Sequence, residues 1–259
     1  MSQLEVHQFP YEFYDNYGVL IHSPVTGETA CIDAGVSETY LEALDEKEWT
    51  LTHILVTHHH RDHITGLEAL KASTGAQVIG PDYVCNVPIP AIDTRVRDGD
   101  TFTFAGHDVS VIHTPGHTQD IVNYHFEDQK MVFVGDTLFA MGCGKVFFGS
   151  AEMVYQSLQK FVSLIPEDTL IYCSHEYAQE NGQYAMQVDP NNEALIARLK
   201  EVDVLREKDI PTVPFTLATE LATNPFLRPH DVGIRRQLQM ESATDEEVFV
   251  EIRRLRDID

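Results

Sequence analysis

The chain is short of positive charge. Lys and Arg together number 18 against 41 Asp and Glu, so the formal net charge of the 259 residues is −23. Nucleic acid and anionic membrane repel so acidic a protein, and we expect neither as a partner. An anionic ligand would need a local group of basic side chains.

The chain also lacks patterned cysteine and long apolar runs. Its four cysteines show no C-x-x-C spacing and no disulfide framework, which predicts reduced, mostly buried thiols. No window approaches the roughly 18 apolar residues of a membrane helix. Residues 1–10 contain no Lys or Arg and no apolar core, unlike a secretory signal. We therefore expect a cytoplasmic protein.

The first two thirds of the chain alternate strand-like runs with turns rich in Gly, Pro and Asp. Helical patterns interrupt the strands at residues 37–47, 63–73 and 151–164. This mixture predicts two sheets with helices outside them. The expected strands cover residues 19–22, 29–33, 53–57, 76–79, 101–104, 108–113, 121–126, 131–134 and 170–173.

The character of the chain changes after Ser174. Residues 191–208 and 242–257 carry apolar side chains at helical spacing, and Pro211 and Pro214 separate the two runs. We therefore expect one domain over residues 1–174 and a helical domain over residues 175–259.

The most informative segment is Thr57–His63, which reads H-x-H-x-D-H after an apolar run. Neutral imidazole and carboxylate groups hold zinc, iron or manganese. We interpret His58 and His60 as the end of a strand, where period-two geometry points both side chains the same way. Asp62 and His63 would then begin the following helix.

Three further candidates follow predicted strands. His117 lies in T-P-G-H-T, Asp136 in G-D-T-L-F and His175 in S-H-E-Y. Ligands at the ends of strands in one sheet face one cleft. The combined set suffices for two metals with one bridging carboxylate.

Together these motifs resemble those of the metallo-β-lactamase-fold hydrolases, and more closely those of glyoxalase II, the hydroxyacylglutathione hydrolases. The similarity covers nearly the whole chain. Phe13–Tyr17 is similar to the family's N-terminal Asp-Asn-Tyr motif, Gly142–Lys145 to its G-C-G-[KR] loop, and Asn224–Arg228 fits its helical domain. The resemblance implies an α+β fold, a metallo-β-lactamase-type αβ/βα four-layer sandwich with a C-terminal helical domain. It also implies that residues 1–174 are the catalytic domain and that residues 175–259 bind the substrate.

The resemblance also implies two divalent metal ions, with zinc foremost and iron or manganese as alternatives. Asp62 and Asp136 would be the catalytic carboxylates, since Asp62 would orient the nucleophile and Asp136 would bridge the metals. Asp33 and Thr57 would fix the orientation of the ligands. The implied ligand sets are His58, His60 and His117 for one metal, Asp62, His63 and His175 for the other, and Asp136 for both.

The remaining histidines are interpreted as ordinary ones. His59 alternates with the ligands and should point away from the metals, as a solvated or supporting residue, and His113 is expected to be a strand residue. The others lack the context of a ligand: His22, His53, His107, His125 and His230.

In the resembling family, basic residues of the G-C-G loop and of the last helix hold the glycine carboxylate of glutathione. They correspond to Lys145, Arg253 and Arg256, and the two arginines share a helix face because they are three residues apart. Tyr177 corresponds to a tyrosine that contacts the glutathione backbone, and Phe147 stands where many members have tyrosine.

Three other departures from the family's pattern concern the anchors and the ligand loops. Arg256 replaces a common lysine, Arg61 replaces Trp or His, and Gln119–Asp120 stands in the T-x-G-H segment.

We thus expect a monomeric thioesterase that acts on S-(2-hydroxyacyl)glutathione, chiefly S-D-lactoylglutathione, and gives glutathione and D-lactate in methylglyoxal detoxification. The first alternative is a glutathione persulfide dioxygenase of the same fold, which uses a single iron. A lactonase or β-lactamase-like hydrolase comes next, followed by a metal-binding protein without activity. The complete set of seven ligands and the long helical C-terminus favour the thioesterase over the dioxygenase, and the basic anchors argue against a lactonase.

Overall fold

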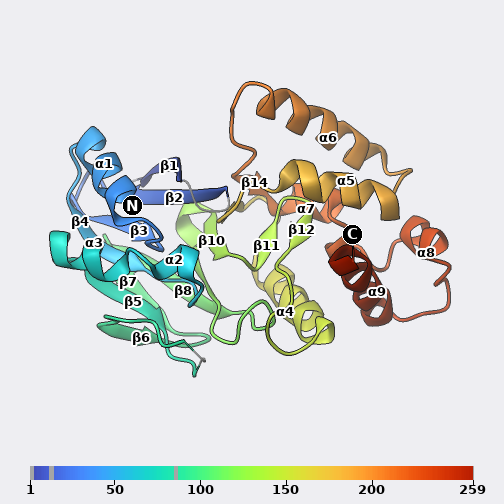
Figure 1. Cartoon of the computed structure of the whole chain (residues 1–259), viewed down its shortest axis with the longest axis horizontal. Coiled ribbons are helices and arrows are strands. Elements are labelled where there is room, and N and C mark those ends of the chain that lie inside the picture. Colours follow the sequence, from blue (N-terminus) through green and yellow to red (C-terminus); the bar gives the residue numbers. More distant parts are fainter. Residues whose placement is uncertain (1–2, 12–14, 85–86, 259) are drawn as a thin grey trace. The chain divides into compact units, whose positions relative to one another are not determined.

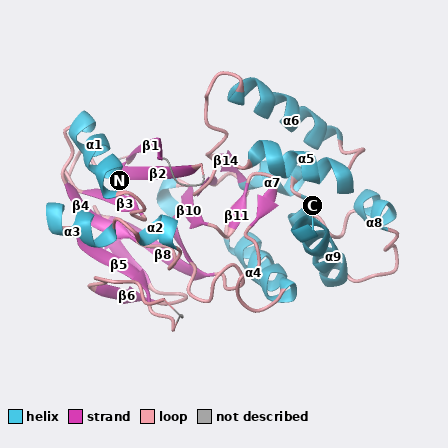
Figure 2. Cartoon of the chain, in the orientation of Figure 1, coloured by secondary structure: helices cyan, strands magenta, loops and turns pink. Residues whose placement is uncertain are grey.

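The computed structural model describes residues 3–11, 15–84 and 87–258. The chain forms two compact units (Figures 1 and 2). The first comprises the described residues up to His113 together with Thr118–Gly135, and the second comprises Thr114–His117 and the chain from Asp136 onward. The expected domain boundary after residue 174 follows the change in sequence character and stays a prediction.

The described residues of the first unit contain a six-stranded sheet whose strand order follows the chain. Its first three strands are antiparallel neighbours, and the later ones pair in parallel. Parallel neighbours need a crossover connection, which helices supply here between the third, fourth and fifth strands. The strands are β1 (Glu5–Tyr11), β2 (Asn16–His22), β3 (Thr29–Ile32), β4 (Leu51–Leu55), β5 (Gln77–Pro81) and β6 (Thr94–Val96).

The crossover helices cover this sheet with apolar side chains. They are α1 (Ser37–Lys47), α2 (Arg61–Ile64) and α3 (Leu67–Thr74). Leu44 and Leu70 pack into one buried cluster with Ile54 of β4, and each such leucine contributes about 1.5–3 kcal/mol by its burial. Tyr40 joins the cluster and donates its hydroxyl proton to Ile32 O at 2.8 Å, so its polar group is satisfied.

The rest of the first unit is an antiparallel meander. Its strands are β7 (Thr101–Phe104), β8 (His107–His113), β9 (Val122–Phe126) and β10 (Met131–Gly135), with the 3₁₀ turn η1 (Glu127–Gln129) before β10. Every residue of β9 is buried, and the Tyr124 hydroxyl donates to Val56 O at 2.7 Å just beyond β4. This contact ties the meander to the first sheet at the start of the ligand-bearing loop.

The second unit is mainly helical. Ser150 caps α4, in which Val154, Leu158 and Phe161 form a buried apolar stripe. Two short strand pairs, β11–β12 and β13–β14, lie among the helices. The elements are β11 (Leu138–Phe139), β12 (Gly142–Cys143), α4 (Ala151–Leu164), β13 (Leu170–Cys173), α5 (Ala178–Val188), α6 (Glu193–Arg206), β14 (Phe215–Thr216), α7 (Leu217–Thr223), η2 (Pro225–Leu227), α8 (Val232–Leu238) and α9 (Asp245–Ile258).

Two local expectations were wrong. The helix expected over residues 63–73 is two helices, because the chain turns at Gly66, whose amide donates to Ala34 O at 2.8 Å. A Cβ atom there would lie 2.4 Å from Ser37 N, so the approach requires glycine. His58 and His60 lie in a loop and not on a strand, since β4 ends at Leu55.

The composition also led to expectations about membrane helices and cysteine side chains. In the part of the chain that the structure describes, no helix is long and apolar enough to cross a membrane. Cys31, Cys143 and Cys173 are buried free thiols, as expected. Cys85 lies outside the described residues, as do Phe13 and Tyr14 of the N-terminal motif.

A buried carboxyl group supports the connection between β11 and β12. Glu220 Oε2 accepts hydrogen bonds from Met141 N at 2.7 Å and from Asn224 Nδ2 at 2.8 Å. Asn224 Nδ2 also donates to Gly142 O at 2.9 Å. Burial raises the pKa of Glu220 from its ordinary 4.5 to about 7.

This raised pKa makes stability fall as pH rises. The folded protein keeps the Glu220 proton up to about pH 7, whereas the unfolded chain releases it near 4.5. The contribution is therefore complete below about pH 4.5 and is lost as pH rises through 7. Between about pH 5 and 8, we expect the free energy of unfolding of the wild type to fall relative to that of Glu220→Gln by on the order of 2–3 kcal/mol. Urea titrations of both proteins across this range measure the difference, and a difference that does not vary with pH contradicts the assignment.

Candidate metal centre and substrate pocket

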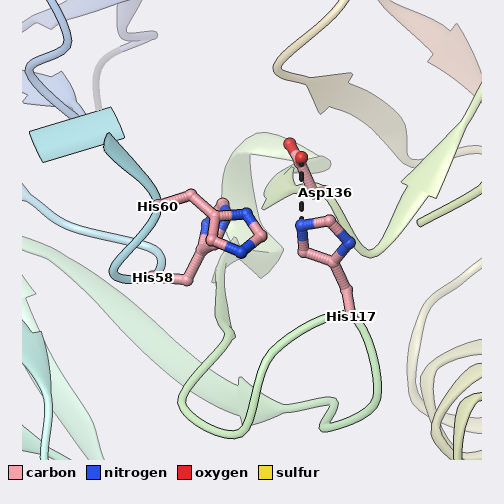
Figure 3. Close-up of side chains that lie close together, drawn as sticks. All are labelled: His58, His60, His117 and Asp136. Atoms are coloured by element: carbon pink, nitrogen blue, oxygen red, sulfur yellow. Dashed lines mark ion pairs between the residues drawn. The ribbon is translucent and has the colours of Figure 1, made fainter. Parts of the chain in front are cut away.

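The first unit brings four of the predicted ligands together. His58 and His60 lie in the loop after β4, and Asp62 and His63 lie in α2. The ring centroid of His58 is 4.8 Å from that of His60 and 4.1 Å from that of His63. His63 Nε2 lies 3.2 Å from Asp62 Oδ2. Figure 3 shows His58 and His60 beside each other.

Asp33 supports this group of predicted ligands through hydrogen bonds. Its carboxylate accepts from Thr57 N at 2.7 Å, from Thr57 Oγ1 at 2.8 Å and from His63 Nδ1 at 2.8 Å. Because Thr57 N donates its proton to the Asp33 side chain, it does not continue the pairing of β4, which ends before His58. Thr57 Oγ1 lies 3.0 Å from His58 Nδ1, and since its proton goes to Asp33, it accepts the Nδ1 proton of His58. Both imidazoles therefore carry their proton on Nδ1 and a lone pair on Nε2.

Asp62 is positioned by the N-terminal strands. Asn16 Nδ2 donates to Asp62 Oδ2 at 3.3 Å, and the Tyr11 hydroxyl donates to Asp62 O at 2.9 Å. The described part of the Asp-Asn-Tyr motif thus contributes a hydrogen bond to a predicted catalytic carboxylate. The sequence showed a similarity of this segment to the family's Asp-Asn-Tyr motif but did not predict this contact.

The second unit brings the other three predicted ligands together. His117 Nε2 lies 3.2 Å from Asp136 Oδ2, and His175 Nε2 lies 3.3 Å from Asp136 Oδ1. Figure 3 shows the His117 imidazole facing Asp136. His117 Nδ1 donates to Lys145 O at 2.9 Å, which again leaves the lone pair on Nε2. All three side chains are buried.

Glycine allows the loop after β12 to approach these ligands. A Cβ atom on Gly144 would lie 2.2 Å from Asp136 O and 2.9 Å from His117 Cβ. No side chain fits at that position. The second glycine of the G-C-G-K loop therefore lets the backbone carry Lys145 past the ligands.

The donor atoms in each unit fit divalent cations. A carboxylate oxygen at 3.2–3.3 Å from an imidazole nitrogen that carries a lone pair is a repulsive arrangement unless a cation or a proton lies between them. Asp136 presents one oxygen to His117 and the other to His175, which suits a bridging carboxylate. Nitrogen and oxygen donors of this kind suit zinc, iron and manganese.

Four of the five predicted substrate-binding residues, Lys145, Tyr177, Arg253 and Arg256, line one cavity of the second unit, with a volume of about 350 Å³. Phe139 and Tyr177 form one part of its wall, and both rings contact His175, with Tyr177 stacked at 4.7 Å between centroids. Another part of the wall is charged. It consists of Lys145, Arg253, Arg256, Glu180 and Asp257.

The three cations differ in their surroundings. Arg253 is only 5% exposed, donates to Cys143 O at 3.3 Å and pairs with Asp257 at 2.9 Å. Arg256 pairs with Glu180 at 2.6 Å. Lys145 is exposed, and its ammonium contacts no carboxylate of the described chain. Burial raises the pKa of the Cys143 thiol to about 11, so the cavity wall is neutral at that position.

Some predicted positions lie elsewhere. Phe147 does not line this cavity; it is 65% exposed, and its ring contacts that of His117 edge-on at 5.4 Å. His59 supports the Gln119–Asp120 segment, which departs from the family's pattern. Its Nδ1 lies 2.7 Å from Asp120 Oδ1, and that carboxylate is buried. Sequence reasoning missed Glu180 and Asp257, since acidic residues on helices are usually solvated.

Comparisons with known proteins agree with this geometry. The sequence profile of the metallo-beta-lactamase superfamily matches residues 16–175, and the profile described as hydroxyacylglutathione hydrolase C-terminus matches residues 176–258. A hydroxyacylglutathione hydrolase from Brucella anthropi is 50% identical over 99% of this chain and 97% of that relative. The chain belongs to the hydroxyacylglutathione hydrolase family.

Further relatives support membership of this family and of the larger metallo-β-lactamase superfamily. A hydroxyacylglutathione hydrolase from Brucella ovis is 48% identical over 99% of both chains. The crystal structure of ETHE1 from Myxococcus xanthus superposes with a TM-score of 0.69 at 26% identity, over 96% of this chain and 90% of that chain. The expected α+β fold and the hydrolase class are confirmed. The family and the donor sets together indicate a dinuclear metal site.

The role of Asp33 can be tested by changing its acceptors. In Asp33→Asn, an amide would face His63 Nδ1 or Thr57, so the histidine would no longer be fixed with its lone pair on Nε2. We expect metal affinity to fall by about 10–100-fold. Competition with a chelator measures the affinity, and circular dichroism checks the fold. Asp45→Asn, at an exposed position of α1, is the matched control. Equal affinity in the two variants would remove Asp33 from the ligand support.

Proposed function

We propose that this protein hydrolyses S-(2-hydroxyacyl)glutathione, with S-D-lactoylglutathione as the main substrate, to glutathione and D-lactate in methylglyoxal detoxification. The observation that carries the proposal is the charged cavity whose aromatic wall contacts His175. A glutathione thioester has charged ends and one reactive carbonyl. Its binding site must therefore have charged side chains close to a group of metal ligands. Relatives that match this chain over nearly its full length carry the name of this activity.

We assign the ligands as the motifs suggest. His58, His60 and His117 would hold one metal, Asp62, His63 and His175 would hold the other, and Asp136 would contact both. Each cation would then have imidazole and carboxylate donors. This assignment is supported by the tautomers that Asp33, Thr57 and the Lys145 carbonyl impose on three of the imidazoles.

Two bound divalent cations supply Lewis acidity and a water that ionises near neutral pH. Asp62, held by Asn16, orients the attacking oxygen. Tyr177 and Phe139 exclude water beside His175 and place the thioester against the ligands. The leaving group is a thiolate, which departs without a strong general acid.

The substrate anchors divide by their surroundings. Lys145 offers an ammonium that no described carboxylate neutralises, so it is the principal anchor for a substrate carboxylate. Arg253 and Arg256 contribute charge from positions fixed by their own partners. Tyr177 contacts the peptide part of the ligand. Phe147 acts through its contact with His117, since the hydroxyl of the more common tyrosine is missing.

Three further properties belong to the same proposal. Zinc is the metal that we favour, with iron and manganese as alternatives, because the donor set suits all three. The enzyme works as a cytoplasmic monomer. Its partner is a small thioester, and its acidic charge opposes binding to nucleic acid or anionic membrane.

An assay of the purified, metal-analysed enzyme tests the reaction class. S-D-lactoylglutathione should be cleaved equally with and without oxygen, because hydrolysis requires only water. Glutathione persulfide and a lactone serve as comparison substrates. Consumption of the persulfide that depends on oxygen, without thioester cleavage, would establish the dioxygenase alternative instead. Preferential cleavage of the lactone would establish the other hydrolase alternative.

The bridging role of Asp136 gives a separate prediction. Asp136→Ala removes both oxygens that face His117 and His175, so the variant should lose at least one metal per chain and nearly all turnover. Elemental analysis and thioester hydrolysis are measured on the same sample. Asp45→Ala, at an exposed position of α1, is the control. Two retained metals with a rate near that of the wild type would exclude a bridge.

A further inference from the structure

The charged wall of the cavity in the second unit is mixed in sign. It contains three cations, Lys145, Arg253 and Arg256, and two carboxylates, Glu180 and Asp257. Its formal charge is therefore +1. Each acid in the wall repels the carboxylates of a ligand, so an acid that a ligand can reach favours ligands that also carry positive charge.

The two carboxylates occupy different environments. Asp257 pairs with Arg253, a side chain that is 5% exposed and lies over the ring of Phe226 at 5.1 Å. The buried position of Arg253 therefore fixes the ion pair that it forms with Asp257. The side chain of Glu180 is 67% exposed, while that of its partner Arg256 is 17% exposed. Glu180 therefore presents its carboxylate to solvent, where an incoming ligand can reach it.

The contact of Glu180 with Arg256 leaves part of the carboxylate available. Arg256 Nη2 donates to Oε1 at 2.6 Å, and Oε2 makes no hydrogen bond with the described residues. An ionised carboxylate has about four acceptor positions. Glu180 can thus accept a second cation while it keeps Arg256 in place.

The proposed substrate has a matching charge pattern. Glutathione carries two carboxylates and one α-ammonium at neutral pH, a net charge of −1, against +1 in the cavity wall. We propose that Glu180 is a specificity-determining residue that receives the α-ammonium of the γ-glutamyl group. Through it, the cavity favours a zwitterionic γ-glutamyl end and disfavours thioesters that are purely anionic. This inference rests on the proposed glutathione thioester function.

Binding to the metal-loaded full-length enzyme tests the inference without turnover. The probes are S-methylglutathione and its N-acetyl derivative, which differ in the α-ammonium, and calorimetry gives both dissociation constants. The wild type should bind the N-acetyl derivative about two- to five-fold more weakly, the range of a partly exposed ion pair. In Glu180→Gln this preference should disappear or reverse. Gln keeps the length of the side chain and a carbonyl for Arg256, and the exposed position tolerates the change.

Glu251→Gln is the matched control. Glu251 lies on α9 and pairs with the exposed Arg254, and neither residue lines the cavity. This variant should keep the preference of the wild type. The inference is overturned if the wild type binds both probes equally, or if Glu180→Gln retains the preference. Because these constants do not depend on thioester cleavage, they separate a wrong assignment of Glu180 from a wrong reaction class.

Discussion

Each predicted ligand imidazole whose Nδ1 contact is described gives its Nδ1 proton to a fixed acceptor, and the arrangement of the candidate ligands depends on this requirement. Asp33 accepts the proton of His63, Thr57 that of His58, and the Lys145 carbonyl that of His117. Each acceptor is set by the fold of its own unit. A neutral imidazole has one proton, so these contacts decide which nitrogen can bind a cation. The ligand set is therefore a consequence of strand ends and loop paths as much as of the motif.

The G-C-G-K loop joins the ligand chemistry of the second unit to its cavity. Gly144 passes against Asp136 and His117. The next residue, Lys145, accepts a hydrogen bond from His117 with its carbonyl and also lines the cavity. Cys143 O accepts a hydrogen bond from Arg253. A change in the path of this loop would thus alter a ligand tautomer and a substrate anchor together. The buried contacts of Glu220 and Asn224 hold the start of the loop and limit such changes.

Local patterns in the sequence predicted the parts that depend on local physics. Residues 37–47 and 151–164 form helices with the expected bounds, and residues 101–104 and 170–173 form the expected strands. The break at Gly66 was missed, because it depends on how closely the chain approaches Ser37, which no periodicity records. The two-residue strands β11 and β12 are too short to show an alternation.

The same limit applies to the candidate site. Spacing brought His58, His60 and His63 into one group, but the contacts that orient them link residues 24 or 30 positions apart, such as Thr57 and His63 with Asp33. Glu180 and Arg256 are 76 positions apart. Arg256 was named from the resemblance of the last helix, but nothing in the segment around Glu180 distinguishes it from an ordinary solvated helix residue. Phe147 was placed by resemblance alone, and its ring contacts a ligand instead of the cavity.

The acidity of the chain explains why the cavity wall contains side chains of both charge signs. Three of the chain's 18 basic residues gather at one cavity of a protein with a net charge of −23. Guanidinium groups this close together repel one another unless carboxylates lie among them. Asp257 and Glu180 relieve that repulsion and hold the arginines in fixed positions. Long-range attraction of an anion is weak for such a protein, so recognition depends on contacts within about one Debye length, roughly 8–10 Å. At that range the order of charges along the wall matters more than their sum, and a ligand with both signs of charge is the one that the wall can distinguish.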